Sequence, residues 1–153
     1  MKLLVVGAAI ALAACVRSSA PKTLPPSIEQ TVDGSPSVTF QAALRAITAQ
    51  GLPLREADPA SRVIQTQFVD MTEYDRQTAA QYPASERAVR FKILIAPNPN
   101  GRGSSLAIFG LYAPFRSGYV TSERNERTIP RDHPGMTIVK RLRDDIVKAV
   151  GGG

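Results

Sequence analysis

Two stretches with helical periodicity enclose a region with strand periodicity, and this arrangement restricts the fold more than any other feature. The first stretch has one apolar stripe, made of Phe40, Ala43, Leu44 and Ile47. The second has a similar stripe, made of Met136, Val139, Leu142, Ile146 and Val150. Residues spaced by three and four fall on one face of an α-helix. Each helix therefore needs an apolar surface against which to pack, and a sheet formed by the intervening residues can supply it.

The ends of both helices are marked by residues that commonly occupy such positions. Ser35 and Pro36 precede the first stripe, and a serine cap followed by proline is typical of a helix start. Gly51 follows the stripe and favours a left-handed C-terminal stop. Pro134 marks the start of the second helix, which is expected to end at the glycines of 151–153.

The segment 64–69 has the alternation of a half-buried strand. We expect Ile64, Thr66 and Phe68 on its core face and the two intervening glutamines on the other face. A shorter strand is expected just after the first helix, at residues 52–54, where a proline favours an edge position.

Two further strands follow and are expected to form a hairpin. In the segment 89–95 the apolar residues alternate with Arg90 and Lys92, which we expect to face solvent. The segment 105–112 is apolar on both faces, as in a central strand. The Asn-Gly pair at 100–101 favours the positive φ angles of a turn between them.

These elements predict an α+β fold. We expect a two-layer sandwich in which two helices pack on one face of an antiparallel sheet. The sheet has four strands, or five if the residues around 28–32 add one.

The N-terminus carries the second informative pattern. Lys2 is followed by an apolar run from Leu3 to Ala13, and the only cysteine of the chain, Cys15, comes just after it. A basic start, an apolar run of about 7–15 residues and small residues at a cleavage point are typical of a secretory signal peptide. A membrane-spanning helix needs about 20 apolar residues, and Arg17 ends this run too early.

The sequence Leu12-Ala13-Ala14-Cys15 resembles the lipobox of bacterial lipoprotein signal peptides. The resemblance implies cleavage between Ala14 and Cys15, a diacylglyceryl group on the cysteine sulfur and acylation of the new amine. Two or three acyl chains hold a protein on a membrane, whereas one chain binds marginally. In enterobacterial lipoproteins an aspartate after the cysteine retains the protein at the inner membrane, so Val16 favours the outer membrane, facing the periplasm. The alternatives are a stray thiol in a plain secretory signal and a buried cysteine in a cytosolic helix.

The domain organisation follows from these two patterns. We expect a signal peptide over residues 1–14, and a lipidated N-terminus with a Pro/Ser-rich tether over residues 15–36. A single α+β domain is expected over residues 37–150, and a glycine tail over residues 151–153.

Composition argues against several classes of function. One cysteine and one histidine leave no metal site built on these residues, and we expect neither a metal nor a cofactor. A formal net charge of +6 suits an anionic neighbour such as lipid headgroups, lipopolysaccharide phosphates or an acidic protein, and equally suits plain solubility. No recognition motif for nucleic acid appears, so no nucleic-acid partner is expected.

A second pattern covers about 30 residues, mostly predicted core positions. A helix led by Phe40 ends in Gly51; Leu52-Pro53-Leu54 and Asp58 follow, and then an Ile-x-Thr-x-aromatic strand at 64–68. This pattern resembles the BamC-like helix-grip domains of envelope lipoproteins, which are accessory to outer-membrane β-barrel assembly. The resemblance implies the same two-layer fold. The chain departs from the pattern where Ser61-Arg62 replaces the usual glycine and Phe68 replaces the usual tryptophan.

Two groups of polar residues are candidates for catalysis. Asp70, Glu73 and Asp75 follow the 64–69 strand, and paired carboxylates are able to bind calcium or perform acid–base work. Their spacing matches no calcium-loop signature. His133 precedes the last helix without any nucleophile motif, so we expect a surface turn residue or a helix cap.

The segment 112–131 is the strongest candidate for a binding surface. It interleaves aromatic residues with arginines, and both types are enriched in protein interfaces. Alternatively it is an ordinary solvated loop, with Tyr112 and Phe115 in the core. The candidate residues are Tyr112, Phe115, Arg116, Tyr119, Arg124, Arg127 and Arg131.

Taken together, the sequence predicts a lipid-anchored envelope protein with a non-enzymatic binding or assembly-accessory module. Its partner is expected to be another envelope protein or an anionic polymer. One alternative is an envelope hydrolase or polymer-modifying enzyme that uses Asp70, Glu73 and His133. The other is a carrier whose helices grip an apolar ligand over the sheet.

Overall fold

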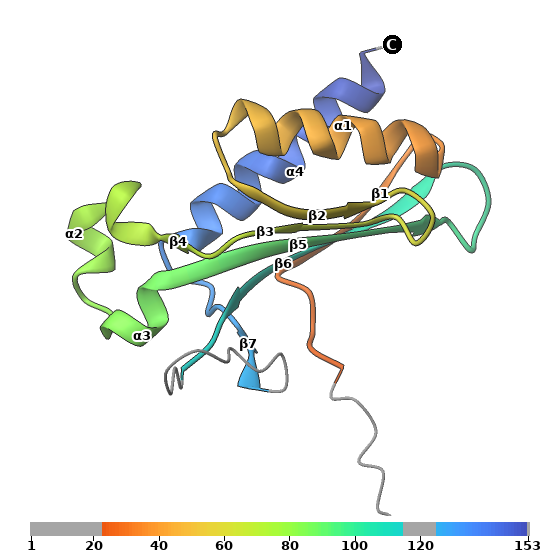
Figure 1. Ribbon diagram of the computed structural model, residues 1–153. Coiled ribbons are helices and arrows are strands. Elements are labelled where there is room, and N and C mark those ends of the chain that lie inside the picture. Colours follow the sequence, from red (N-terminus) through yellow and green to blue (C-terminus); the bar gives the residue numbers. More distant parts are fainter. Residues whose placement is uncertain (1–22, 115–124, 153) are drawn as a thin grey trace, which may run out of the picture.

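The predicted α+β sandwich is confirmed. A computed structural model describes residues 23–114 and 125–152 of the chain. An antiparallel sheet has the strand order β1-β6-β5-β3-β2, and two short strands extend it, since β4 pairs with β5 and β7 pairs with β6. Figure 1 shows the two long helices, α1 and α4, lying together over one face of this sheet.

The bounds of the elements are as follows. The strands are β1 (Ile28–Val32), β2 (Leu54–Asp58), β3 (Val63–Thr66), β4 (Val69–Asp70), β5 (Ala88–Pro97), β6 (Ser104–Tyr112) and β7 (Arg127–Thr128). The helices are α1 (Pro36–Ala49), α2 (Arg76–Ala79), α3 (Ala84–Arg87) and α4 (Gly135–Gly151), with a 3₁₀ turn η1 at Met71–Glu73.

Both long helices form as their sequence patterns predict. Ser35 caps α1, because its hydroxyl accepts the Val38 N–H at 3.4 Å, and Pro36 occupies the first turn. Gly51 adopts a φ of +67° just after this helix, which is the left-handed conformation that glycine tolerates. The stripe of α4 is buried from Met136 to Ile146, and Val150 packs against the core at its end.

The hairpin of β5 and β6 forms the centre of the sheet. Val89, Phe91, Ile93 and Ile95 of β5 are 0–4% exposed and face the helices, as expected. The turn between the strands spans residues 98–103, and Gly101 has the positive φ that the Asn-Gly pair predicts. Strand β6 lies between β1 and β5, so its prediction as a central strand is confirmed.

Two predicted boundaries are wrong. The tether is expected to reach residue 36, yet residues 28–32 form β1, with Ile28 opposite Ile108 of β6, so the five-stranded alternative is confirmed. The apolar side chain of Val32, which is 4% exposed, holds this end of the segment in the core. The strand expected at 52–54 begins only at Leu54, because Leu52 is buried and its N–H donates back to the carbonyl oxygen of Ile47 in α1 at 3.1 Å.

Strands β3 and β4 are separated by a bulge, which makes the predicted placement of Phe68 wrong. Gln65 pairs with Lys92 and Val69 pairs with Val89, so three residues of one strand face two of the other. An extra residue reverses the alternation of side chains beyond it. Phe68 therefore lies against Arg90 on the far side of the sheet from the helices.

Candidate binding face

Among the described residues, no long helix lies over the face of the sheet opposite α1 and α4, and we call this the open face. Antiparallel pairing places directly opposed residues on the same face. The register therefore assigns residues of five strands to the open face. In order across the sheet they are Glu56 and Asp58 of β2, Val63 and Gln65 of β3, Arg90, Lys92, Leu94 and Ala96 of β5, Ser105, Ala107, Phe109 and Leu111 of β6, and Glu29 and Thr31 of β1. An apolar row of Val63, Leu94 and Ala107, all half-buried, crosses three strands and ends in Asp58 and Glu29.

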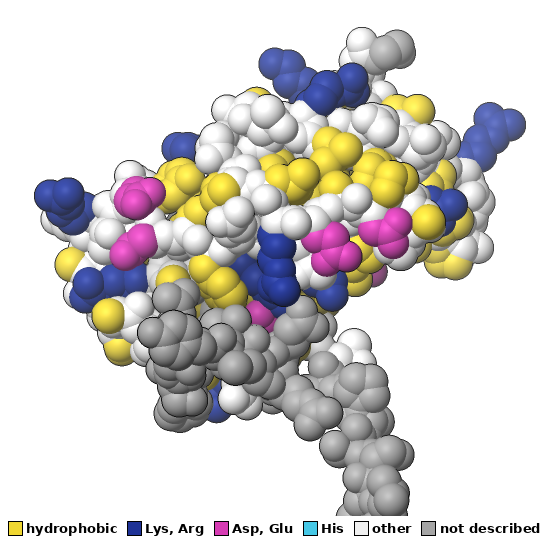
Figure 2. All heavy atoms as spheres, viewed as in Figure 1, with side chains coloured by type: hydrophobic (Ala, Val, Ile, Leu, Met, Phe, Trp, Pro, Cys, Tyr) yellow, Lys and Arg dark blue, Asp and Glu magenta, His cyan; other side chains and the backbone are white. Residues whose placement is uncertain are grey.

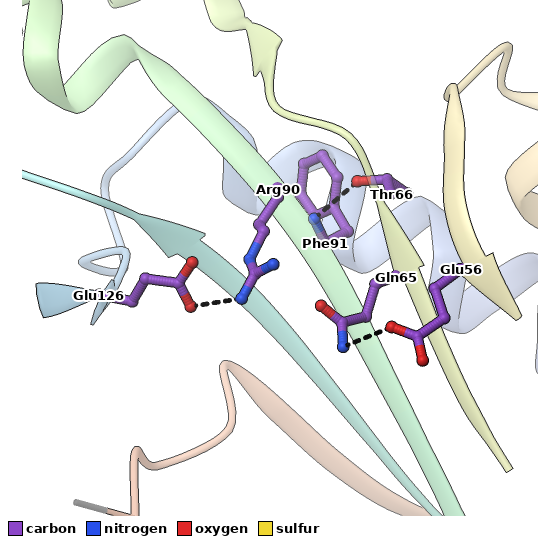
Figure 3. A network of polar contacts seen from close by, with 6 residues as sticks. All are labelled: Glu56, Gln65, Thr66, Arg90, Phe91 and Glu126. Atoms are coloured by element: carbon purple, nitrogen blue, oxygen red, sulfur yellow. Dashed lines mark hydrogen bonds and ion pairs between the residues drawn. The ribbon is translucent and has the colours of Figure 1, made fainter. Parts of the chain in front are cut away.

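Beyond this row, the open face carries a buried ion pair. The Nη2 atom of Arg90 lies 2.7 Å from Oε2 of Glu126, and the two side chains are only 2% and 4% exposed. Figure 3 shows both side chains meeting on the near side of β5 and β6, with Phe91 behind the strand. The Arg90 guanidinium carbon also lies 5.7 Å from the centre of the Phe68 ring, a cation–π distance. The prediction that Arg90 faces solvent is wrong, because its charge is held by Glu126 and Phe68.

A polar pair lies beside it on the open face. Gln65 is 8% exposed, and its Nε2 atom donates a weak hydrogen bond of 3.4 Å to Oε2 of Glu56 on the edge strand β2. The other amide atom, Oε1, is buried and has no hydrogen-bond partner among the described residues. Figure 3 shows these side chains in line along the sheet next to the ion pair.

The predicted surface at 112–131 is only partly placed. Tyr112 is half-buried and packs against the core, so it does not belong to an exposed surface. Arg127 of β7 lies opposite Tyr112 of β6 and is exposed, and Arg131 is exposed as well. Phe115, Arg116, Tyr119 and Arg124 lie outside the described residues.

The acidic candidates have local roles. The Asp70 carboxylate accepts the N–H and the hydroxyl of Thr72 at 2.9 and 2.8 Å, and so caps the 3₁₀ turn. Asp75 caps α2 in the same way, and the hydrogen bonds from Thr78, first its N–H and then its hydroxyl, lower the pKa of this carboxyl. Among the described residues no group of three or more His, Cys, Asp or Glu side chains is arranged to hold a metal ion. Glu73 is exposed and neither caps an element nor joins such a group.

His133 is a buried helix cap, so only half of its prediction is confirmed. Its ring is 2% exposed, and Nδ1 accepts the N–H of Gly135 at 3.0 Å, at the start of α4. Nε2 lies 3.0 Å from the carbonyl oxygen of Glu86 and therefore carries the proton. The Tyr82 ring lies against it, with centroids 4.6 Å apart. Burial lowers the pKa of this imidazole, and the Glu86 carbonyl and nearby acids offset only part of that effect.

This geometry makes His133 a source of acid sensitivity. The folded protein binds this proton only at a lower pH than the unfolded chain does, and the unfolded chain gains it as the pH falls through about 6.5. The free energy of unfolding is therefore expected to fall between pH 7.5 and pH 5.5, as measured by urea denaturation. Because the chain has one histidine, a His133→Gln variant should lose most of this dependence. An equal decline in both proteins would contradict the assignment.

Sequence reasoning missed the central residues of the open face. The sequence predicts Arg90 in solvent, Phe68 on the core face and Gln65 on the opposite face. It predicts no role for Glu126. The one available signal was an arginine in the middle of a strongly apolar strand. Neither its burial nor its acidic partner, 36 residues away, is visible in a local pattern.

The surface around the open face is mixed in character. Figure 2 shows hydrophobic side chains gathered between α1 and the sheet edge at β2, with acidic side chains just below them. The exposed apolar residues of this region include Val38 and Leu54, at 48% and 46% exposure.

Comparison with protein-family models found no match, and comparison with curated proteins found none either. In the described ranges 23–114 and 125–152, every helix is too short or too polar to cross a bilayer. Ala14 and Cys15 lie outside the described residues.

Proposed function

We propose that this chain is a lipid-anchored protein of the bacterial cell envelope, with a non-enzymatic domain that binds another envelope protein or an anionic polymer. The anchor rests on Cys15, which stands directly after the short apolar run and the small residues before it. The acyl chains would hold the domain on the periplasmic side of the outer membrane, since Val16 rather than aspartate follows the cysteine.

The observation that carries the binding role is the open face. Two long helices cover one side of the sheet, while the other side presents half-buried apolar residues bordered by carboxylates. A partly apolar surface with a charged rim is typical of sites where proteins bind partners. The candidate catalytic groups favour a structural role instead, since Asp70 and Asp75 cap turns and His133 is buried.

Photo-crosslinking in intact cells tests both parts of the proposal. Ala96 is exposed on the open face, and Arg141 is exposed on α4. A photoreactive amino acid at position 96 is expected to give a discrete adduct that is absent when the same amino acid stands at position 141. Mass analysis of the mature N-terminus should show an acylated Cys15, and Cys15→Ser should move the protein to the soluble fraction.

The outcomes separate the two claims. A mature chain without acyl groups contradicts the anchor, whatever it crosslinks to. An acylated chain that gives the same adducts from positions 96 and 141 contradicts the binding role of the open face.

A further inference from the structure

The N-terminal segment joins the folded domain through hydrogen bonds at the end of the sheet that carries β7. The hydroxyl of Thr128 donates to the carbonyl oxygen of Pro25 at 2.7 Å. Two residues later, the Ser27 N–H donates to the carbonyl oxygen of Ile108 at 2.9 Å, and the Gly110 N–H donates to the Ser27 hydroxyl at 2.9 Å. Figure 1 shows the segment leaving beside β7, on the side of the sheet away from α1, α4 and the C-terminus.

The distance from the anchor to this place is short. Pro25 is ten residues beyond Cys15. A chain of ten residues reaches at most about 35 Å, even when it is fully extended. If Cys15 carries acyl chains, the β7 end is the part of the domain held closest to the bilayer.

The charges at this end suit an anionic surface. Arg17 and Lys22 lie in the connecting sequence, and no acidic residue occurs from Cys15 to Ile28. Arg127 of β7 and Arg131 beyond it are both exposed. Glu126 precedes Arg127 directly in the sequence, and it is buried in its ion pair with Arg90, so it offsets the charge of Arg127 little. Asp132 is exposed as well and offsets part of this positive charge. Burial first, and the nearby Asp132 carboxylate second, raise the pKa of the Tyr82 hydroxyl, so this acid also acts on that ring.

We infer that the β7 end of the domain docks on the membrane, with Arg127 and Arg131 contacting anionic phospholipid headgroups. This inference rests on the proposed lipid anchor. Each arginine near an anionic leaflet favours contact by about fivefold, and the tether makes the encounter intramolecular. The docked domain turns its helix layer toward the aqueous side.

Lipid-quenching of two fluorescent labels tests this orientation. The acylated full-length protein is reconstituted in vesicles of equal parts phosphatidylglycerol and phosphatidylcholine that contain a headgroup nitroxide lipid. One label is attached through Pro130→Cys, next to the two arginines, and the other through Lys140→Cys on α4, where both residues are exposed. Because acylation occupies Cys15, each variant offers a single thiol. Quenching at position 130 is expected to exceed that at position 140 severalfold, and to fall when phosphatidylcholine replaces the anionic lipid.

Charge reversal supplies the matched control. Arg127→Glu with Arg131→Glu should abolish the extra quenching at position 130, while Arg141→Glu with Lys148→Glu, the same change in charge on α4, should leave it intact. The inference is overturned if the acylated protein shows equal quenching at both positions, or if the two double variants behave alike. A chain that carries no acyl group instead contradicts the proposed function, and mass analysis of the reconstituted sample distinguishes these results.

Discussion

Replacing Glu126 with alanine is expected to lower the free energy of unfolding by about 3–5 kcal/mol. The Arg90 side chain is 2% exposed, so water cannot replace the carboxylate that lies 2.7 Å from it. Removing one partner of a buried pair leaves the remaining charge without its compensation, and this cost exceeds the net contribution of the intact pair. Urea denaturation at neutral pH, with Glu126→Ala beside the wild type, measures the difference.

An exposed ion pair in the same chain provides the control. Arg143 lies 2.7 Å from Asp144, with the aspartate side chain 64% exposed. Asp144→Ala should therefore change stability by less than about 1 kcal/mol, although the two distances are the same. A Glu126→Leu, Arg90→Met double variant should recover most of the loss, since apolar residues of similar size often replace a buried pair without cost. A loss below about 1 kcal/mol for Glu126→Ala would mean that water reaches the pair.

The ion pair has a structural consequence for the open face. Glu126 stands directly before β7, and β7 holds the N-terminal segment through the bond from Thr128 to Pro25. The pair therefore fixes both the end of the sheet and the point at which the chain departs toward its proposed anchor. Weakening it should disturb the orientation of the domain as well as its stability.

The helices and the central hairpin could be predicted because their signals are local. A stripe such as that of α1 lies within 14 residues, and the proline, serine and glycine at its ends act on neighbouring backbone groups. The burial of β5 follows similarly from its own alternation. The coarse fold then needs only one tertiary rule, that two apolar stripes pack on one sheet face.

The candidate site could not be predicted because it depends on pairing between distant residues. An arginine within a strand is usually solvated. The burial of Arg90 depends on partners from other parts of the chain, which among the described residues include Glu126 and Phe68. The position of His133 has the same origin, since α3 and Tyr82 cover a residue whose neighbours in the sequence are all polar or turn-forming. Phe68 was assigned to the wrong face because a bulge of one residue leaves no mark in a pattern of alternation.

A second large loss of stability is expected at Thr66, which lies at the bulge and whose side chain is fully buried. Its hydroxyl oxygen accepts the Phe91 N–H at 2.9 Å, and its proton is donated to the carbonyl oxygen of Gln67 at 2.8 Å. The hydroxyl thus replaces the ladder partner that the bulge removes from β5. Thr66→Val keeps the shape but leaves both backbone groups without this partner, and is expected to lower the free energy of unfolding by about 2–3 kcal/mol.

A serine at the same position tests this reasoning. Thr66→Ser removes one methyl group and keeps the hydroxyl, so its cost should be about 1 kcal/mol, clearly below that of valine. Amide hydrogen exchange gives a local readout: the Phe91 N–H should lose protection in Thr66→Val and keep it in Thr66→Ser. If valine is tolerated better than serine, the site is dominated by apolar packing and the hydroxyl does not close the bulge. Preserved protection at Phe91 in the valine variant would lead to the same conclusion, because the N–H would then have another acceptor.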